Sequence, residues 1–448
     1  MSELPVGWVE TTIGEICAMG PKSAWDDGME IGFVPMSHAP TNFRGPLNYE
    51  ARRWHEIKKA YTHFENDDVI FAKVTPCFEN GKAALVAGLP NGAGAGSSEF
   101  HVLRRRDAGI SPSYLLAVIK SAQFLREGEE NMTGAVGLRR VPRAFVENFP
   151  VRLPPEAEQK RIAQKLDELL AQVDTLKARI DALPALLKRF RQSVISHGVS
   201  GSLAVDQHAS FDTTTWRHMR AEDVCTKVQS GGTPKEGFTT EGTRFLKVYN
   251  IVDGLIDFEY RPQYIATDIH QGSCRKSITS PGDVLMNIVG PPLGKIAVVP
   301  QGVDEWNINQ AITLFRPSES ISSAWIHLVL LEGTNIRRVS QETKGSAGQV
   351  NISLSQCRDF VFPVPPTQIQ DEIVRRVEQL FAYADQLEAK VAAAQQRIDA
   401  LTQSLLAKAF RGELVPQDPT DEPASALLER IRAQRAAAPK PKRGRKKV

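Results

Sequence analysis

The sequence of 448 residues has few cysteines and no long run of apolar residues. Because no stretch of about 18 consecutive apolar residues occurs, we expect no transmembrane helix. The first residues, MSELPVGWVETTIGEI, include acidic side chains and lack the basic-then-apolar order of a secretory signal. The five cysteines are scattered and never spaced as CxxC: Cys17, Cys77, Cys225, Cys274 and Cys357. This usage fits a reducing, cytoplasmic compartment and argues against a structural zinc site.

Known catalytic motifs are also missing. The sequence contains no G-x-S-x-G nucleophile elbow, no H-E-x-x-H motif and no Asn/Asp-Pro-Pro-aromatic tetrapeptide of the kind that positions an amino group for methyl transfer. The segment from Gly290 to Ile296 differs from a phosphate loop, because three residues rather than four separate its glycines and Ile296 replaces the magnesium-binding Ser or Thr. We therefore predict that this chain performs no catalysis and holds no metal ion or cofactor of its own.

The net positive charge of the chain comes from one end of the sequence. The composition, 42% hydrophobic and 24% charged, is that of an ordinary soluble protein, with a net charge of +3. Residues 438–448, APKPKRGRKKV, carry six basic residues and no acidic one, so the remaining body has a net charge of −3. We expect this tail to be disordered, and a solubilising or loosely nucleic-acid-attracting role is favoured over specific docking.

What the sequence does contain is a long internal repeat. The segments 134–205 and 345–416 follow one pattern at a constant offset of 211 residues, without insertion or deletion. Each has a glycine-rich loop, a Pro-Pro pair (154–155 and 365–366), a long apolar heptad pattern and a Gly-x-Leu ending. A tandem duplication in constant register predicts two similar modules positioned by two matched helices.

Apolar residues in both repeats recur with alternating steps of four and three. This 3.5-residue period is typical of a coiled coil, and its narrow stripe predicts that each helix packs against one partner helix rather than inside a core. Coiled-coil positions are predicted at Ile162, Leu166, Leu169, Val173, Leu176, Ile180, Ile373, Val377, Leu380, Leu387, Val391 and Ile398.

The two predicted helices span 154–205 and 365–415. Pro155 and Pro366 suit a first helical turn, and about 40 residues per helix give a rod of about 60 Å. Pro184 has Gln395 as its counterpart, so we expect a kink or a break in the first helix only. Because the termini of a compact domain often lie close together, the helices are expected to run antiparallel, with one module at each end and an approximate twofold axis.

The two modules, 1–153 and 206–364, share landmarks. DVIFAKVTPCFENGKAALV from Asp68 matches DVLMNIVGPPLGKIAVV from Asp283, and short β-branched runs within both predict strands. One helix per module is predicted from SPSYLLAVIKSAQFLREG and SSAWIHLVLLEGTNIRRV.

Cys17 and Cys225 occupy matching places without a matching histidine, which favours buried strand-end thiols over nucleophiles. The predicted fold is α+β, a pseudo-twofold tandem repeat whose two mixed α/β modules are separated by the helices; residues 416–448 form a C-terminal helix and tail.

Polar, glycine-bearing loops recur at equivalent places in both modules. Asn and Gln side chains can bind adenine with two hydrogen bonds, Arg and Lys can bind guanine, and glycine loops let the backbone approach phosphates. Each residue alone is also compatible with a solvated loop or a turn. The candidate DNA contacts are Lys22, Lys73, Thr75, Lys82, Arg139, Arg140 and Arg143 in the first module, and Lys235, Lys247, Asn250, Lys295, Asn309, Gln310, Lys344, Gln349 and Asn351 in the second.

These features together resemble the DNA-specificity subunits of type I restriction–modification enzymes. The resemblance covers nearly the whole chain. It rests on TGAVGLRRVPRAFVENFPVRLPPEAEQKRIAQKL and its partner KGSAGQVNISLSQCRDFVFPVPPTQIQDEIVRRV, on KVQSGGTPKEG and DVLMNIVGPPLGKIAVV, and on the helix end AFRGELVPQDPTDEPASALLERI. The first module departs from the pattern, having MGPKSAWDDG in place of an SGGTP loop.

The resemblance implies two target-recognition domains, each reading one half of a split, asymmetric sequence in double-stranded DNA. It implies that the helices set the unread gap and bind two methyltransferase subunits, which carry S-adenosylmethionine chemistry on adenine. Translocase–nuclease subunits that use ATP and magnesium are also implied, and no membrane partner is expected.

Two alternatives stay open on the residues alone. One is a non-catalytic coiled-coil scaffold whose modules bind proteins, and the other is a self-sufficient modification enzyme, which the missing methyl-transfer motif disfavours.

Overall fold

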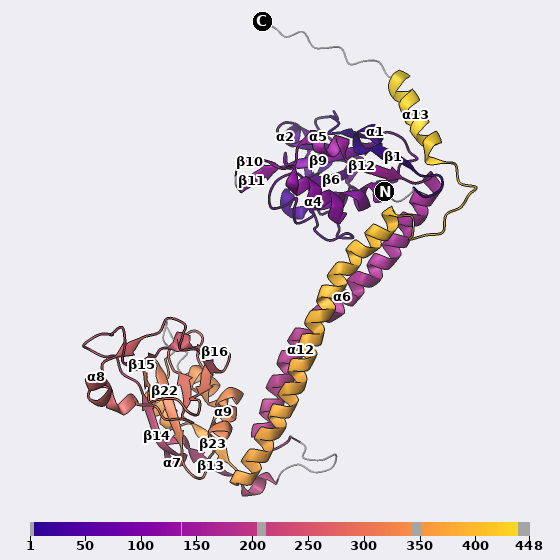
Figure 1. The fold of residues 1–448 in the computed structure, drawn as a ribbon. Helices are drawn as coiled ribbons and strands as arrows, with labels where there is room; N and C mark the ends of the chain where they lie inside the picture. Colours follow the sequence, from indigo (N-terminus) through magenta and orange to yellow (C-terminus); the bar gives the residue numbers. More distant parts are fainter. Residues whose placement is uncertain (1–3, 136, 204–211, 343–350, 438–448) are drawn as a thin grey trace. The chain divides into compact units, whose positions relative to one another are not determined.

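The computed structural model describes residues 4–135, 137–203, 212–342 and 351–437. The chain divides into two compact units, the first made of residues 1–181 and 392–448 and the second of residues 182–391. Each unit contains one globular module and adjoining stretches of two long helices, α6 (Glu156–Val199) and α12 (Thr367–Phe410) (Figure 1). None of the helices in the described ranges has the length and hydropathy of a membrane span.

The module of unit 1 combines three sheets and a short hairpin. A two-stranded sheet pairs β1 (Val9–Thr12) with β12 (Pro150–Leu153). A four-stranded sheet has the order β2 (Cys17–Met19), β9 (Phe100–Arg105), β6 (Val69–Ala72), β7 (Ala83–Leu85). A second four-stranded sheet has the order β4 (Glu50–Arg53), β3 (Glu30–Val34), β8 (Ala93–Gly96), β5 (Thr62–Glu65). The hairpin joins β10 (Thr133–Ala135) to β11 (Leu138–Arg140).

The module of unit 2 repeats the two-stranded sheet and the first four-stranded sheet, but its other sheet has three strands rather than four. β13 (Arg217–Arg220) pairs with β23 (Val361–Val364). The four-stranded sheet has the order β14 (Cys225–Ser230), β22 (Ile312–Pro317), β19 (Val284–Asn287), β20 (Ile296–Val298). The other sheet has the order β18 (Tyr264–Ile265), β15 (Thr243–Leu246), β21 (Asn307–Ile308), and a separate hairpin joins β16 (Ile251–Val252) to β17 (Leu255–Ile256). The predicted α+β tandem repeat is confirmed.

Short helices cover the sheets in both modules. In unit 1 they are α1 (Ile13–Ile16), α2 (Trp54–Ile57), α3 (Pro112–Ile119), α4 (Ala122–Glu130), α5 (Arg143–Asn148) and the 3-10 turns η1 (Met36–His38) and η2 (Pro90–Gly92). In unit 2 they are α7 (Ala221–Val224), α8 (Thr267–Gln271), α9 (Ser323–Glu332), α10 (Thr334–Glu342), α11 (Leu354–Arg358) and η3 (Thr213–Thr215), η4 (Val248–Asn250) and η5 (Arg275–Ser277). A last helix, α13 (Ala424–Ala437), belongs to unit 1.

The prediction of one helix per module after the four-stranded sheet is wrong, because each segment forms two helices. Between α3 and α4, the side chain of Ser121 accepts a hydrogen bond from the N–H of Phe124 and so caps a new helix. Between α9 and α10, Gly333 adopts a φ of 83°, the left-handed conformation that commonly ends a helix.

The long helices start and stop at the repeated signals of the sequence. The N–H of Gln159 donates to the carbonyl of Pro155 (2.9 Å), and that of Gln370 to the carbonyl of Pro366 (3.1 Å). Both helices contain 44 residues and end shortly before glycines with positive φ at positions 201 and 412. The bounds therefore lie inside the predicted ranges at both ends.

Pro184 does not interrupt α6, which runs from Glu156 to Val199 as one helix. Of the predicted kink or break, the break is therefore wrong, and the kink stays a prediction. Pro184 is exposed, so the carbonyl of Ile180 that it leaves without an N–H donor lies on a side of the helix that water can reach. Proline at such a position removes one backbone hydrogen bond without burying the unsatisfied acceptor.

Hydrogen bonds and ion pairs within each unit give the relative direction of the two long helices. As the residue number increases along α6, the number of its partner on α12 decreases, which establishes the predicted antiparallel pairing. The pairs are Lys177 with Asp399 and Asp181 with Gln395 in unit 1, and Arg191 with Asp385 in unit 2.

The first turns of both long helices are built into the module cores. Ile162 and Leu166 belong to the core of unit 1, and Ile373 and Val377 to that of unit 2. The expectation that each helix packs only on its partner helix is thus wrong at these ends. Leu176, a predicted coiled-coil position, has 46% of its surface exposed, so this position in the middle of α6 is not buried against a partner.

A buried glutamine at each helix start joins the helix to its module. The side-chain oxygen of Gln159 accepts from the N–H of Ser111 (2.8 Å), and its amide group donates to the carbonyl of Pro154 (3.0 Å). Gln370, 211 residues later, accepts from the N–H of Ser322 (2.9 Å) in the same way. The repeated register of the sequence therefore corresponds to a repeated junction in three dimensions.

Candidate nucleic-acid interface

In the first module, two candidate lysines reach the edge at which two parallel strands end. β3 and β8 run parallel, so their carboxyl ends lie at one edge of the sheet. The ammonium of Lys73 donates to the carbonyl of Ser98 (2.7 Å), just beyond β8. The ammonium of Lys82 donates to the carbonyl of Met36 (3.0 Å), just beyond β3. Both charges are thereby held at the same edge.

The segment around the β10–β11 hairpin is hydrogen-bonded to the chain at Lys73, next to this edge. The N–H of Val141 donates to the carbonyl of Lys73 (2.8 Å). The N–H and hydroxyl of Thr75 both donate to the carbonyl of Arg139, at 3.0 and 3.3 Å. Lys73, Thr75, Arg139 and Arg140 therefore gather into one region. Lys22 is exposed in the loop after β2 and makes none of these hydrogen bonds.

Each arginine of this group faces a carboxylate. Arg140 makes two hydrogen bonds to Glu99, at 2.8 and 2.9 Å, and this guanidinium holds the pKa of Glu99 below its ordinary value. Arg139 lies 3.9 Å from Glu79 and 4.0 Å from Glu129. A phosphate or a guanine edge must compete with these carboxylates, which favours selective over indiscriminate contact with an anion. Arg143 pairs with Glu147 (2.9 Å) one turn along α5.

The second module presents the corresponding edge at the ends of β15 and β21. These strands also run parallel, and the N–H of Asn309 donates to the carbonyl of Leu246 (3.0 Å). Lys247, Asn309 and Gln310 therefore follow the strands at one edge. The ammonium of Lys295 donates to the carbonyl of Ile251 (3.2 Å), as Lys82 does to Met36 in the first module.

The glycine loop after β14 packs on the end of β21. A Cβ atom on Gly231 would lie 1.9 Å from the carbonyl oxygen of Ile308, so only glycine fits this approach. The hydroxyl of Thr233 donates to the side-chain oxygen of Gln310. The side-chain oxygen of Asn309 is buried and has no hydrogen-bond partner among the described residues. Lys235 is exposed further along the same loop.

Asn351 completes the match between the two modules. A bridge pairs Val289 with Asn351, as another pairs Val74 with Arg140 in the first module. Asn351 is exposed and takes the place of an arginine. Lys344 and Gln349 lie outside the described residues.

Comparisons with known proteins agree with this repeated arrangement. A family model described as "Type I restriction modification DNA specificity domain" matches residues 5–185 and 213–394. The chain belongs to this family. It is 30% identical to the type I restriction enzyme EcoEI specificity subunit of Escherichia coli over 496 aligned positions, covering 90% of this chain and 83% of that protein.

Solved structures share the fold. The HsdS subunit of Thermoanaerobacter tengcongensis superposes with a TM-score of 0.62 at 22% identity, covering 92% of this chain and 98% of that one. A chain from a structure of a type I R-M system complex superposes with a TM-score of 0.67 at 21% identity, covering 92% of this chain and all of that one.

The structure corrects one of the predicted DNA contacts of this specificity-family chain, Asn250. It is only 1% exposed, and its side-chain oxygen accepts from the N–H of Lys247 (2.9 Å). Its amide group donates to the carbonyls of Asp257 (2.8 Å) and Tyr260 (2.9 Å). With its donors and acceptor used internally, Asn250 shapes the loop that carries Lys247 and is not available to a base.

The structure adds aromatic residues that the sequence analysis did not select. Phe238 has 42% of its surface exposed, and the ammonium of Lys247 lies 4.5 Å from its ring centroid. Tyr260 is also exposed, with the Arg261 guanidinium 5.5 Å from its ring. Aromatic rings beside basic groups can stack on bases. The sequence places a basic residue, Arg261, directly beside Tyr260, but it gives no such signal for Phe238.

Other repeated residues are structural. Buried Asp68 bonds Arg104 at 2.7 and 2.9 Å, and buried Asp283 bonds Arg316 at 2.8 Å, which anchors the loop before β6 and its equivalent before β19. Burial raises the pKa of the Cys17 thiol to about 12, so this group is a protonated core residue at neutral pH. In the described ranges, no group of three or more His, Cys, Asp or Glu side chains is arranged to hold a metal ion.

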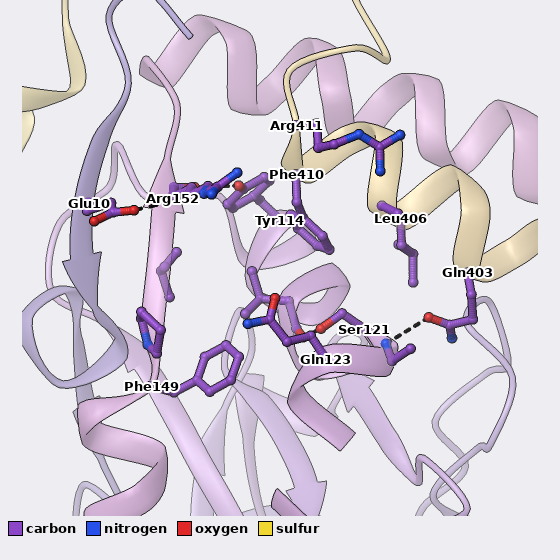
Figure 2. Close-up of a pocket in the computed structure, with 15 residues that line it drawn as sticks. Glu10, Tyr114, Ser121, Gln123, Phe149, Arg152, Gln403, Leu406, Phe410 and Arg411 are labelled. Carbon is purple, nitrogen blue, oxygen red and sulfur yellow. Dashed lines mark hydrogen bonds and ion pairs between the residues drawn. The ribbon is translucent and has the colours of Figure 1, made fainter. Parts of the chain in front are cut away.

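A groove of about 450 Å³ lies in unit 1 where α12 meets the module (Figure 2). Tyr114 and Phe410 meet edge to face with ring centroids 5.7 Å apart, and the side-chain oxygen of Gln403 accepts from the N–H of Ala122 (2.8 Å). These interactions attach α12 to the capped start of α4. They assign the groove to the junction between helix and module rather than to the candidate interface.

Proposed function

We propose that this chain reads a bipartite, asymmetric sequence in double-stranded DNA, with one half-site for each module. The observation that supports the proposal most directly is the matched pair of sheet edges in the two modules. Equivalent loops meet beyond a parallel strand pair in both modules, yet the side chains on them differ. Two modules that recognise different DNA sequences require a shared backbone framework with different polar side chains.

The chemistry of each edge suggests what it reads. The first module presents Arg139 and Arg140, whose guanidinium groups suit the O6 and N7 acceptors of guanine. The second presents Asn309, Gln310 and Asn351, whose amides suit the N6 donor and N7 acceptor of adenine. Lysines at both edges, with Lys22 and Lys235 in the loops after β2 and β14, suit phosphates.

The helices are proposed to set the number of unread base pairs between the half-sites. Each contains 44 residues, and at about 1.5 Å per residue a helix of this length exceeds the ~34–36 Å repeat of one DNA face. The antiparallel ion pairs along α6 and α12 support a spacer of constant length, since sliding one helix on the other would break them.

The chain is proposed to act without catalytic chemistry of its own, in the cytoplasm with the host DNA. Two methyltransferase subunits would dock on the helical region and supply S-adenosylmethionine chemistry, and translocase–nuclease subunits would use ATP and magnesium. The scaffold alternative makes a different prediction. A scaffold would co-purify with proteins and show no preference for any DNA sequence.

Mapping of N6-methyladenine across the host genome tests the proposal. We expect a methylated motif of two short half-sites with a fixed gap, present in the host strain and absent after deletion of this gene. Reintroduction of the gene should restore the motif. The proposal fails if the methylation pattern is the same with and without the gene.

A further inference from the structure

The β16–β17 hairpin of the second module exposes two apolar side chains side by side. Val252 and Leu255 are paired directly across the two strands, so their side chains lie on the same face of the hairpin. Val252 has 41% of its surface exposed, and Leu255 has 73%. Covering this apolar pair would be favourable, because burial of apolar surface stabilises a contact in proportion to its area.

The hairpin holds the apolar pair in a defined position. The two residues of its turn, Asp253 and Gly254, have positive φ values of 49° and 80°, as a tight turn between antiparallel strands requires. The other cross-strand pair, Ile251 and Ile256, packs in one apolar core of the module, where Ile251 is 1% exposed. Because side chains alternate along a strand, burial of the isoleucines directs the apolar pair outward.

The hairpin adjoins the edge that carries the candidate DNA contacts of the second module. The 3-10 turn η4 connects Lys247 directly to β16. The ammonium of Lys295 donates to the carbonyl of Ile251 (3.2 Å), at the base of the hairpin. The N–H of Asn309 donates to the carbonyl of Leu246 (3.0 Å), next to Lys247. The apolar pair therefore lies beside groups that suit phosphates and adenine.

Charge favours a base edge over the DNA backbone as the ligand of this hairpin. Asp253 places a carboxylate at the turn, and a carboxylate is repelled by a phosphate. Lys247 and Lys295 carry the positive charges that suit phosphates. With the lysines on the backbone, the apolar pair faces the major groove, where the apolar group that a base presents is the 5-methyl group of thymine.

The first module has no equivalent of this hairpin among its described residues. β3 and β4 pair as β15 and β18 do, but the described residues 35–49 between β3 and β4 form the 3-10 turn η1 and no strand. The hairpin is thus a difference between the two modules at the edge where their base preferences are expected to differ.

We propose that Val252 and Leu255 contact the 5-methyl group of thymine in the half-site that the second module reads. The amides of Asn309 and Gln310 suit adenine, so hydrogen bonds to adenine and apolar contact with thymine together select A·T pairs. A cytosine in the place of the thymine presents no methyl group and leaves the apolar pair against polar edges. The inference rests on the proposed DNA-reading function.

The test replaces thymine by deoxyuridine, which removes only the methyl group. The chain, assembled with its methyltransferase subunits, is titrated with motif duplexes in which the thymines of one half-site, then of the other, are replaced, and fluorescence anisotropy at constant salt gives the affinity. Deoxyuridine in one half-site should weaken binding by about fourfold for each contacted methyl group, the factor that corresponds to burial of one such carbon. The double variant Val252→Ser, Leu255→Ser should lose this discrimination, and Leu255→Ala alone should lose part of it.

The other half-site is the internal control, since deoxyuridine there should affect the original chain and the variants alike. Unchanged unfolding midpoints are expected, because both substituted positions are exposed. The proposal is overturned if the variants keep the full discrimination, if neither half-site distinguishes deoxyuridine from thymine, or if the motif contains no A·T pair. Equal weakening on all duplexes, or poor assembly with the methyltransferase subunits, would also overturn it, because the apolar pair would then contact something other than the methyl group.

This result is separable from the proposed function. If the unmodified complex prefers no DNA sequence, the proposed reading function fails. If it prefers the motif and yet does not distinguish deoxyuridine from thymine, the reading function stands and only the role of the hairpin is removed.

Discussion

At the scale of single residues, internal hydrogen bonding separates two asparagines that look equivalent in the sequence. Asn250 and Asn309 both follow a strand in a polar loop, and both were predicted to bind DNA. The side chain of Asn250 makes hydrogen bonds to three backbone groups. The side-chain oxygen of Asn309 has no hydrogen-bond partner among the described residues. Residue type and loop position predict where polar groups gather, but only the packed structure decides which of them remain available.

Substitution of Asn309 tests this distinction. We expect Asn309→Ala to weaken binding to the motif duplex by about 1–3 kcal/mol and to leave non-specific binding and the unfolding midpoint unchanged. Asn250→Ala is the matched control, and it should lower the free energy of unfolding by about 1–3 kcal/mol because buried carbonyls lose their donors. Equal weakening of all duplexes by Asn309→Ala would contradict its role in reading sequence.

Lys120 offers a prediction on pH. Its ammonium is buried and donates to the carbonyls of Gly81 (2.9 Å), Thr41 (3.1 Å) and Pro40 (3.4 Å), and burial lowers its pKa from 10.5 to about 7. At pH values between the folded-state pKa of about 7 and the ordinary pKa of 10.5, Lys120 binds more protons in the unfolded chain than in the folded one. The free energy of unfolding contributed by this group therefore increases as pH rises from about 7 toward 10.

Urea unfolding at several pH values from about 6.5 to 9, which span the folded-state pKa, measures this contribution. The original chain should gain stability with rising pH relative to Lys120→Met, which lacks the titrating group. Parallel pH profiles for the two proteins would show that Lys120 keeps an ordinary pKa in the folded state.

At the scale of secondary structure, local signals predicted the long helices better than the short ones. Pro-Pro pairs and glycines with positive φ mark the ends of α6 and α12, because each acts through backbone geometry alone. The split between α3 and α4 was missed because the Ser121 cap lies inside an otherwise helical pattern. The heptad stripe likewise did not reveal that Ile162 and Ile373 pack in module cores, since a core and a partner helix select the same apolar side chains.

Pro184 provides a prediction for α6. Because the helix continues through this position, Pro184→Gln should restore the hydrogen bond to the carbonyl of Ile180. We expect the free energy of unfolding to rise by up to about 3 kcal/mol. Ala185→Gln, at the exposed neighbouring position, is the control and should have little effect. A destabilised Pro184→Gln protein would mean that the proline relieves a close approach elsewhere in the helix pair.

At the scale of the whole molecule, the duplication is the feature that the sequence predicted most completely. The offset of 211 residues reappears as matched glutamine junctions, matched sheets and matched strand edges. The identity of the bases was not predictable, because it depends on side-chain geometry at the edges. Exposed Phe238, whose ring contacts the ammonium of Lys247, shows how a neighbouring loop changes that geometry without leaving a repeated signal.

The paired helices are proposed to determine the separation of the two half-sites. One heptad can be inserted between Asp181 and Ala182 in α6 and another between Ala394 and Gln395 in α12, where the helices face each other. Seven helical residues add about 10.5 Å, or about three base pairs at about 3.4 Å each. A heptad in one helix only is the control, and it should abolish motif methylation by breaking the register of the pair.

The decisive measurement is the N6-methyladenine motif in a host that carries the doubly extended chain. We expect the same two half-site sequences with a gap longer by about three base pairs, as the added helical rise requires. Methylation of the original motif with its gap unchanged would contradict it.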